Sequence, residues 1–233
     1  MTPRRGRTLT SLRLLAALGG TLWTAATVGG ARAPEEALHR WSRRLLKHLG
    51  VTADLTGPIP EGAPLWVSNH LSWLDPVVFL ALRPSGALAK LEVAGYPLVG
   101  AGARLAGLRF VDRDNPFSRA TALRALARDL GRGRSFLLFP EGTTTSGQGL
   151  APLREGGLRM AYRLGIPVLP FRLDSPDRHY PWTGDATLMP HLRALAEAGA
   201  THVAVTPGPR LHPQDYPDAD AFVAALRSHL QGS

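Results

Sequence analysis

The sequence predicts an α/β fold in which a mixed, largely parallel sheet is flanked by helices and follows an N-terminal membrane-associating helical segment. Two observations predict the sheet: apolar runs of strand length recur along the chain, and helical patterns separate most of them. A third observation, an uncharged apolar stretch between clusters of arginine, predicts the membrane segment. Strands joined through helices pair in parallel, and the helices then cover both faces of the sheet.

The composition narrows the class of protein. A chain of 233 residues fits one domain with a full core. It has no cysteine, which excludes a thiol nucleophile, disulfides and thiolate metal sites. Residues 1–50 hold nine Lys or Arg and two acids, a balance of +7, so residues 51–233 carry only +2 of the total of +9. A nucleic-acid-binding domain needs its positive charge on the folded body, so we expect an anionic membrane surface as partner and no nucleic acid.

The first fifty residues are predicted to form a membrane-anchoring segment, separate from a domain over residues 51–233. Residues 14–31 carry no charge and, as a helix, would reach about 27 Å, barely the thickness of one hydrocarbon core. Residues 35–50 have the pattern of a basic amphipathic helix that lies in the membrane interface. Its apolar face is formed by Leu38, Trp41, Leu45, Leu46 and Leu49, and its basic face by Arg40, Arg43, Arg44 and Lys47.

Three geometries are open for this segment. Ala31-Arg32-Ala33 resembles the cleavage site of a signal peptide, and residues 14–31 could also be a single span. We favour an anchor embedded in one leaflet, because both basic flanks could then stay on the cytoplasmic face. The predicted location is the cytoplasmic membrane, with the active site facing the cytoplasm. For residues 35–50, the alternative is an ordinary amphipathic helix packed on the domain.

Residues 51–233 are predicted to alternate between strands and helices. Strands are predicted at Pro64–Ser68, Gly86–Lys90, Leu108–Asp112, Ser135–Phe139, Ile166–Leu173 and His202–Thr206. Helices are predicted at Trp73–Leu82, Arg119–Leu130, Glu155–Leu164, Leu188–Ala198 and Asp218–Leu230. Ser118 is the predicted N-cap of the second helix and Gly131 its C′ residue. In sheets of this kind, functional sites form where the strands end.

Two motifs stand at such strand ends. In the first, Asn69 to Asp75, His70 precedes Asp75 by five residues. A neutral imidazole can take the proton from a hydroxyl that attacks a thioester, and a carboxylate on its other ring nitrogen fixes the tautomer. In the second, Phe139-Pro140-Glu141-Gly142-Thr143, glycine permits close approach while the glutamate and threonine offer polar contacts to a polyol. Taken singly, each motif is also compatible with a purely structural role.

Together with two further stretches, these motifs resemble the glycerolipid acyltransferases of the PlsC type, the family that includes 1-acyl-sn-glycerol-3-phosphate acyltransferase. The first family motif, N-H-x4-D, matches Asn69, His70 and Asp75. The remaining three match Gly107-Leu108-Arg109-Phe110-Val111-Asp112-Arg113, Phe139-Pro140-Glu141-Gly142-Thr143 and Ile166-Pro167-Val168-Leu169-Pro170. All four occur in order, between about residues 64 and 173.

The resemblance implies a membrane-associated O-acyltransferase that acts on a lipid. His70 would be the base that deprotonates the acceptor hydroxyl, and Asp75 would orient it. The hydroxyl would attack a thioester of CoA or acyl carrier protein directly. Arg113 and Lys90 would receive the phosphate of the acceptor, and Glu141, Gly142 and Thr143 would line the acceptor site. No cofactor is expected apart from the acyl-CoA or acyl-ACP co-substrate, and no metal.

The expected acceptor is a lyso-lipid, first of all 1-acylglycerol-3-phosphate, which would give phosphatidate. One departure favours an alternative, because Thr144 stands where phosphatidate-forming members commonly carry arginine. Lyso-ornithine lipid or another lysophospholipid is therefore the second hypothesis, and the stretch Tyr180–Asp185 also looks like that subgroup. From other classes, a serine hydrolase using Ser72 or Ser68 lacks a G-x-S-x-G elbow, and a non-catalytic lipid-binding module remains open.

Overall fold

The computed structural model describes Arg13 and residues 34–62, 65–83, 86–91, 109–112, 114–184 and 186–232. The apolar stretch 14–31 and Arg113 lie outside these residues. Among the helices that are described, none is long and apolar enough to cross a membrane. The membrane anchor expected from residues 14–31 therefore stays a prediction.

Seven strands of the described chain form one sheet, in the order β1-β7-β6-β2-β5-β3-β4. They are β1 (Val51–Leu55), β2 (Leu65–Ser68), β3 (Gly86–Lys90), β4 (Arg109–Val111), β5 (Phe136–Leu138), β6 (Val168–Asp174) and β7 (Thr201–Pro207). Neighbouring strands run parallel except β6 and β7, which are antiparallel. The predicted mixed, largely parallel sheet is confirmed, and it brings the carboxyl ends of β2, β5, β3 and β4 to one edge.

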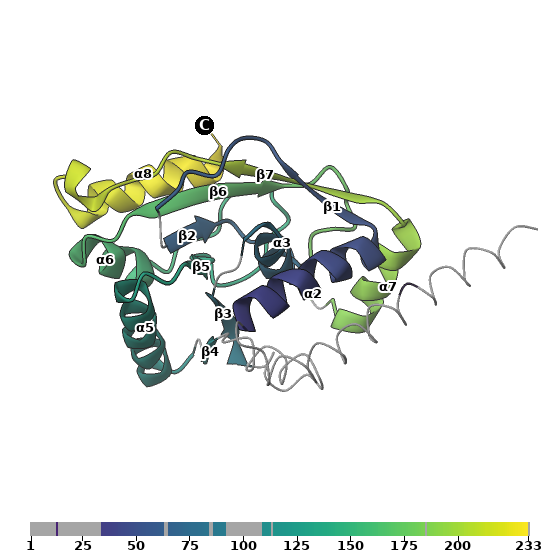
Figure 1. The fold of residues 1–233 in the computed structure, drawn as a ribbon, viewed down its shortest axis with the longest axis horizontal. Coiled ribbons are helices and arrows are strands. Elements are labelled where there is room, and N and C mark those ends of the chain that lie inside the picture. The colour runs from purple at the N-terminus through teal and green to yellow at the C-terminus, as the bar shows by residue number, and fades with distance from the viewer. Residues whose placement is uncertain are drawn as a thin grey trace, which may run out of the picture.

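Helices cover both faces of this sheet (Figure 1). One layer contains α2 (Pro34–Leu49), α3 (Asp75–Leu82) and α7 (Leu188–Ala198), and the other contains α5 (Pro116–Gly131), α6 (Gly156–Arg163) and α8 (Ala219–Gln231). A single 3-10 turn, Pro213–Asp215, precedes α8. Along β2, Trp66 packs into the core beneath the first layer, whereas Leu65 and Val67 pack beneath the second. This alternation places the central strand between two apolar layers, as a parallel sheet requires.

The edge strand β1 was missed by the sequence analysis. Only Val51 of its five residues is buried, and the strand contains Thr and Asp, so the apolar signal is weak. It pairs with β7, with Val51 opposite Thr201. Gly50 has a φ of 72°, and a Cβ atom there would lie 2.2 Å from the carbonyl oxygen of Gly199. The entry to β1 is therefore specified by close approach of two backbones rather than by apolar side chains.

Both predicted caps of α5 are wrong. The N-cap is Asn115, whose side chain accepts hydrogen bonds from the N–H groups of Phe117 and Ser118. Pro116 takes the first helical position, which favours proline because its missing N–H is not needed there. The hydroxyl of Ser118 instead accepts from the N–H of Asp112 at 3.0 Å and so ties β4 to the helix. The helix includes Gly131 and ends against Arg132.

The apolar face of α2 is buried in the domain core. Leu38, Leu45, Leu46 and Leu49 are at most 6% exposed, and the helix packs against α3, α7 and β1. The interpretation of residues 35–50 as a helix whose apolar face lies in lipid is therefore corrected to the packed alternative. The domain boundary expected at residue 50 stays a prediction, although α2, which precedes it, packs against the folded body.

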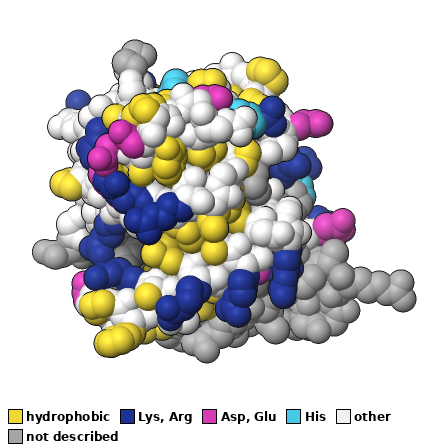
Figure 2. All heavy atoms as spheres, turned by 90° about the vertical axis from the view of Figure 1, so that its left-hand side faces the viewer, with side chains coloured by type: hydrophobic (Ala, Val, Ile, Leu, Met, Phe, Trp, Pro, Cys, Tyr) yellow, Lys and Arg dark blue, Asp and Glu magenta, His cyan; other side chains and the backbone are white. Residues whose placement is uncertain are grey.

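Positive charge is unevenly distributed over the folded body. Figure 2 shows the side of the molecule on which α5 and α6 lie, where Lys and Arg side chains outnumber acidic ones. Arg124, Arg128 and Arg132 are exposed at four-residue intervals from α5 to its C-cap, which places them on one side of the helix. The small net charge of residues 51–233 therefore conceals a strongly basic face.

Replacing Leu49 by alanine should lower the free energy of unfolding by about 2–5 kcal/mol, because the side chain is fully buried and leaves a cavity. Arg43→Ala, on the exposed face of the same helix, should change it by less than about 0.5 kcal/mol. Denaturant titration of both variants measures the difference. Equal stabilities would show that α2 does not contribute to the core.

Candidate active site

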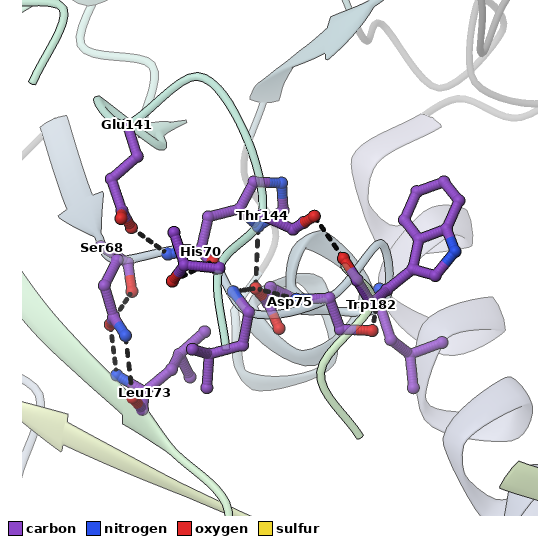
Figure 3. A network of polar contacts seen from close by, with 12 residues as sticks. Ser68, His70, Asp75, Glu141, Thr144, Leu173 and Trp182 are labelled. Carbon is purple, nitrogen blue, oxygen red and sulfur yellow. Dashed lines mark hydrogen bonds and ion pairs between the residues drawn. The ribbon is translucent and has the colours of Figure 1, made fainter. Parts of the chain in front are cut away.

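The first motif forms the loop between β2 and α3, at the carboxyl edge of the sheet. His70 Nδ1 lies 2.8 Å from Asp75 Oδ2 (Figure 3). A carboxylate only accepts, so Nδ1 carries the hydrogen and Nε2 keeps its lone pair. The described residues give Nε2 no hydrogen-bond partner. The imidazole is thus in the tautomer that a general base requires.

Asp75 is fully buried and receives four hydrogen bonds from the residues that the structure describes. Besides the histidine, its Oδ2 atom accepts from the N–H groups of Leu71 at 2.6 Å and Ser72 at 2.9 Å. Its Oδ1 atom accepts from the hydroxyl of Tyr180 at 2.6 Å. A buried carboxylate is tolerated in its charged form only when donors of this kind surround it. Because Asp75 also opens helix α3, the helix dipole favours the same charge.

Glu141 binds the backbone of the His70 loop. Its Oε1 atom accepts from the N–H of His70 at 2.7 Å and its Oε2 atom from the N–H of Ala151 at 2.8 Å. Burial raises the pKa of Glu141 above its usual value, although both N–H donors act in the opposite direction. In the next residues of the same loop, the N–H of Thr145 donates to the carbonyl of His70 at 2.8 Å. Glu141 of the second motif and Thr145, two residues beyond it, therefore hold the backbone of His70 at its N–H and at its carbonyl.

The imidazole plane is fixed by an aromatic ring of the second motif. The rings of His70 and Phe139 are stacked, with centroids 4.2 Å apart and planes inclined by 18°. Phe139 in turn meets the ring of Phe79 on α3 edge to face. Together with the Asp75 hydrogen bond, this stacking leaves the imidazole little freedom to rotate.

Asn69 continues the sheet beyond the last residue of β2. Its side-chain oxygen accepts from the N–H of Leu173 at 2.7 Å, and its side-chain nitrogen donates to the carbonyl of Leu173 at 2.9 Å. The side-chain amide thus replaces a peptide group in the pairing of β2 with β6. This bond anchors the loop immediately before His70.

The end of the second motif turns sharply. Gly142 has a φ of 68°, and a Cβ atom there would come within 2.8 Å of the side chain of Arg154. Both the conformation and the close approach require glycine. Thr143 is exposed next to it. The acceptor-lining role of Glu141, Gly142 and Thr143 stays a prediction.

The side chain of Thr144 makes a hydrogen bond within the protein. Its hydroxyl donates to the carbonyl of Trp182, in the loop that joins β6 to α7 (Figure 3). The N–H of Trp182 donates to the carbonyl of Leu71 at 2.8 Å. The residue that replaces the family's common arginine therefore connects the second motif to this distant loop.

The two expected phosphate ligands are described only in part. β3 ends at Lys90, which pairs with Val111 of β4, so Lys90 lies at the same sheet edge as His70. Its side chain and the whole of Arg113 lie outside the described residues. Arg109, in the same motif as Arg113, has a structural contact, because its guanidinium lies 2.6 Å from Asp129 of α5. Within the described ranges there is no group of three His, Asp or Glu side chains that could hold a metal ion.

The buried residue His191 contacts Trp73, which lies in the loop between β2 and α3. The indole N–H of Trp73 donates to His191 Nδ1 at 2.9 Å, which requires His191 to be neutral. Burial lowers the pKa of His191 below its usual value. Its Nε2 atom is buried without a hydrogen-bond partner among the described residues. Protonation of this side chain is therefore unfavourable in the folded protein.

Sequence reasoning found His70 and Asp75 but did not predict which residues hold them in place: Glu141 was expected to contact the acceptor and not the His70 backbone. Tyr180 lies more than a hundred residues away and was noted only as part of a subgroup-like stretch. Thr145 and the Asn69–Leu173 bond act through backbone groups, which no side-chain pattern encodes. The aromatic stretch around Tyr180 was the one available signal.

A protein-family model described as Acyltransferase matches residues 52–174, which is more than half of the chain. The chain belongs to the Acyltransferase family. The match contains the His70 and Glu141 motifs and ends at the last residue of β6. The recognition made from the four motifs is thereby confirmed.

Curated relatives with two different names resemble the chain. It is 39% identical over 170 residues to the lyso-ornithine lipid O-acyltransferase of Pseudomonas aeruginosa, covering 70% of this chain and 66% of that protein. It is 33% identical over 150 residues to the 1-acyl-sn-glycerol-3-phosphate acyltransferase of Neisseria meningitidis, covering 64% and 57%. The chain therefore spans somewhat less than two thirds of each of these relatives.

A solved structure has the same fold. The 1-acyl-sn-glycerophosphate acyltransferase of Thermotoga maritima superposes with a TM-score of 0.75, covering 99% of this chain and 95% of that one. The sequence identity is 20%, so this likeness concerns the fold alone. It agrees with the helix-flanked, largely parallel sheet described above.

Removal of the Glu141 carboxylate should destabilise the His70 loop. Glu141→Ala leaves the N–H groups of His70 and Ala151 without their acceptor, at a cost of about 1–3 kcal/mol for the buried donor of His70 and less for the partly buried donor of Ala151. Denaturant titration measures the free energy of unfolding. The matched control is Glu197→Ala on the exposed side of α7, which should be close to neutral. A loss no larger than that of the control would contradict the bracing role.

The neutral state of His191 predicts a pH dependence. Because its pKa is lowered by folding, the unfolded chain takes up the proton first as the pH falls below the usual value of about 6.5. This contribution to stability is present above that value and is lost toward the lower folded pKa. Urea unfolding at pH 7.5 and 5.5 should therefore show a smaller stability advantage of wild type over His191→Phe at the lower pH. An unchanged advantage would mean that His191 does not titrate in this range.

Proposed function

We propose that this chain transfers a fatty acyl group from a thioester to the free hydroxyl of a lyso-lipid, with His70 as general base. The observation that carries the proposal is the His70–Asp75 pair, because it leaves the Nε2 lone pair available beside the family's second motif. Membership of the Acyltransferase family and the names of the relatives support the reaction class.

The proposed reaction is a direct acyl transfer. His70 Nε2 takes the hydroxyl proton while the oxygen attacks the thioester carbonyl, and Asp75 stabilises the resulting imidazolium. The tetrahedral intermediate then expels the thiolate as the carbon–sulfur bond breaks. The imidazolium returns its proton to that sulfur, so the products are the acylated lipid and free CoA or acyl carrier protein. No side chain of the enzyme becomes acylated.

Lyso-ornithine lipid is the acceptor that the present observations favour. Besides the P. aeruginosa relative, the lyso-ornithine lipid O-acyltransferase of Brucella abortus is 28% identical over 218 residues, covering 82% of both chains. Thr144 acts in the same direction, because its hydroxyl holds a backbone carbonyl in place of a guanidinium that could bind phosphate.

Lysophosphatidate is the second candidate acceptor and was the first expectation from the motifs alone. The Neisseria relative carries the corresponding name, and Lys90 lies at the edge of the sheet where a phosphate ligand is expected. With either acceptor the lipid is presented by a membrane. We propose the cytoplasmic membrane as the location, with residues 14–31 as the anchor and the site facing the cytoplasm.

The test is acyl transfer from labelled oleoyl-CoA or oleoyl-ACP to lyso-ornithine lipid, lysophosphatidate and lysophosphatidylcholine in detergent. His70→Ala should lower turnover by about 10²–10⁴-fold, as is typical for loss of a general base. His212→Ala is the matched control, because no described contact links it to the site. Transfer to lysophosphatidate alone would reassign the acceptor. Near-normal turnover in His70→Ala would remove the proposed mechanism.

A further inference from the structure

We propose that Tyr180 is a positioning residue that sets both the orientation and the proton affinity of the His70–Asp75 pair. The proposal rests on the function proposed above. Tyr180 is fully buried, and its hydroxyl donates to Asp75 Oδ1 at 2.6 Å. It comes from the loop between β6 and α7, far along the chain from the motif that it contacts.

The two oxygens of Asp75 are held unequally. Oδ2 accepts from His70 Nδ1 and from two backbone N–H groups. Within the described chain, the hydroxyl of Tyr180 is the donor to Oδ1. That hydrogen bond therefore fixes the second oxygen and, together with the three bonds to Oδ2, the rotation of the carboxylate about its Cβ–Cγ bond. Without it, a buried charged oxygen would have no donor.

The phenol also affects when the pair takes up a proton. The pair has a net charge of −1 when the imidazole is neutral and a net charge of zero after His70 has accepted the proton from a hydroxyl. A hydrogen bond to the carboxylate stabilises the net-negative state more strongly than the neutral one. Loss of this hydrogen bond should therefore favour protonation of the pair, whereas Glu141, which also faces the pair, is the same in wild type and in a variant that lacks the bond. Burial and the neighbouring carboxylate raise the pKa of Tyr180, so its phenol stays protonated and remains a donor.

The loop that carries Tyr180 is held by hydrogen bonds on both sides of that residue. On the side of the sheet, the N–H of Tyr180 donates to the carbonyl of Asp177 at 2.9 Å, and the carboxylate of Asp177 accepts from the N–H of His202 on β7 at 2.7 Å. On the side of the site, Trp182 bonds to the carbonyl of Leu71 and to the hydroxyl of Thr144. Tyr180 is thus presented to Asp75 by a braced segment and not by a mobile one.

Tyr180→Phe tests the role with little change in volume. We expect kcat to fall by about ten- to a hundredfold, the range for a lost hydrogen bond to a charged group, while the KM of the lyso-lipid changes less than about twofold. The acidic limb of the pH–rate profile should move to higher pH, because the pair now takes up a proton more readily. A purely structural role would lower the rate equally at every pH.

Tyr162→Phe is the matched control. Tyr162 is partly buried on α6, and its hydroxyl donates to the carbonyl of Tyr216 on the other side of the sheet. This variant should keep the kcat and the pH–rate profile of wild type. A shift of the acidic limb in Tyr162→Phe as large as in Tyr180→Phe would overturn the assignment.

A second variant covers the case in which Tyr180→Phe does not fold. Incorporation of 3-fluorotyrosine at position 180 retains the hydroxyl but makes it a stronger donor, so the acidic limb should move to lower pH. An unmoved limb in whichever of the two variants folds would overturn the proposal.

A spectroscopic readout separates this inference from the proposed function. The His70 Nδ1–H signal, assigned by its absence in His70→Ala, should shift in the Tyr180 variants whether or not the assay detects turnover. If wild type and His70→Ala were equally active, the proposed mechanism would fail while this shift would still report the contact. If His70 proved essential but the Nδ1–H signal and the pH profile were the same in Tyr180→Phe as in wild type, only the inference about Tyr180 would fail.

Discussion

The candidate site depends on keeping one carboxylate, that of Asp75, charged in a place that water does not reach. The cost of burying a charge is several kcal/mol unless donors replace the lost hydration. Asp75 receives its donors from its own loop, from the histidine and from a tyrosine of a remote segment. The packing of the surrounding loops is therefore constrained by one requirement: hydrogen-bond donors must reach both carboxylate oxygens of Asp75.

The order of the strands brings the pieces of this arrangement together. β5 and β6 are the two neighbours of β2, so the segments that follow all three strands meet at one edge. Glu141 after β5 grips the backbone of His70, Asn69 after β2 bonds to Leu173 of β6, and Tyr180 after β6 reaches Asp75. Both neighbours thus contribute restraints to the central loop. The His70–Asp75 pair held in this way is already organised before any substrate arrives.

The sequence was informative where chemistry depends on side-chain type and local spacing. The His70–Asp75 pair, the α/β class and most elements follow from residues close together in the chain, and the family match confirms the recognition. The sequence was misleading where the role of an element depends on which part of the molecule packs against it. The leucines of α2 look the same whether they meet lipid or α3, and β1 is specified by two glycines in contact. Bonds between side chain and remote backbone, such as that of Glu141 to His70, leave no pattern in the sequence.

The contact between Thr144 and Trp182 has a consequence for how such enzymes can diverge. The Thr144 hydroxyl serves as a structural link here, and an arginine at this position would lack the hydroxyl that makes it. Exchange of Thr144 for arginine would add charge at the cost of the link to the loop that carries Tyr180. A substitution at position 144 is therefore expected to alter the placement of the Tyr180 loop as well as the local charge, so its two effects would have to be separated by a second substitution in that loop.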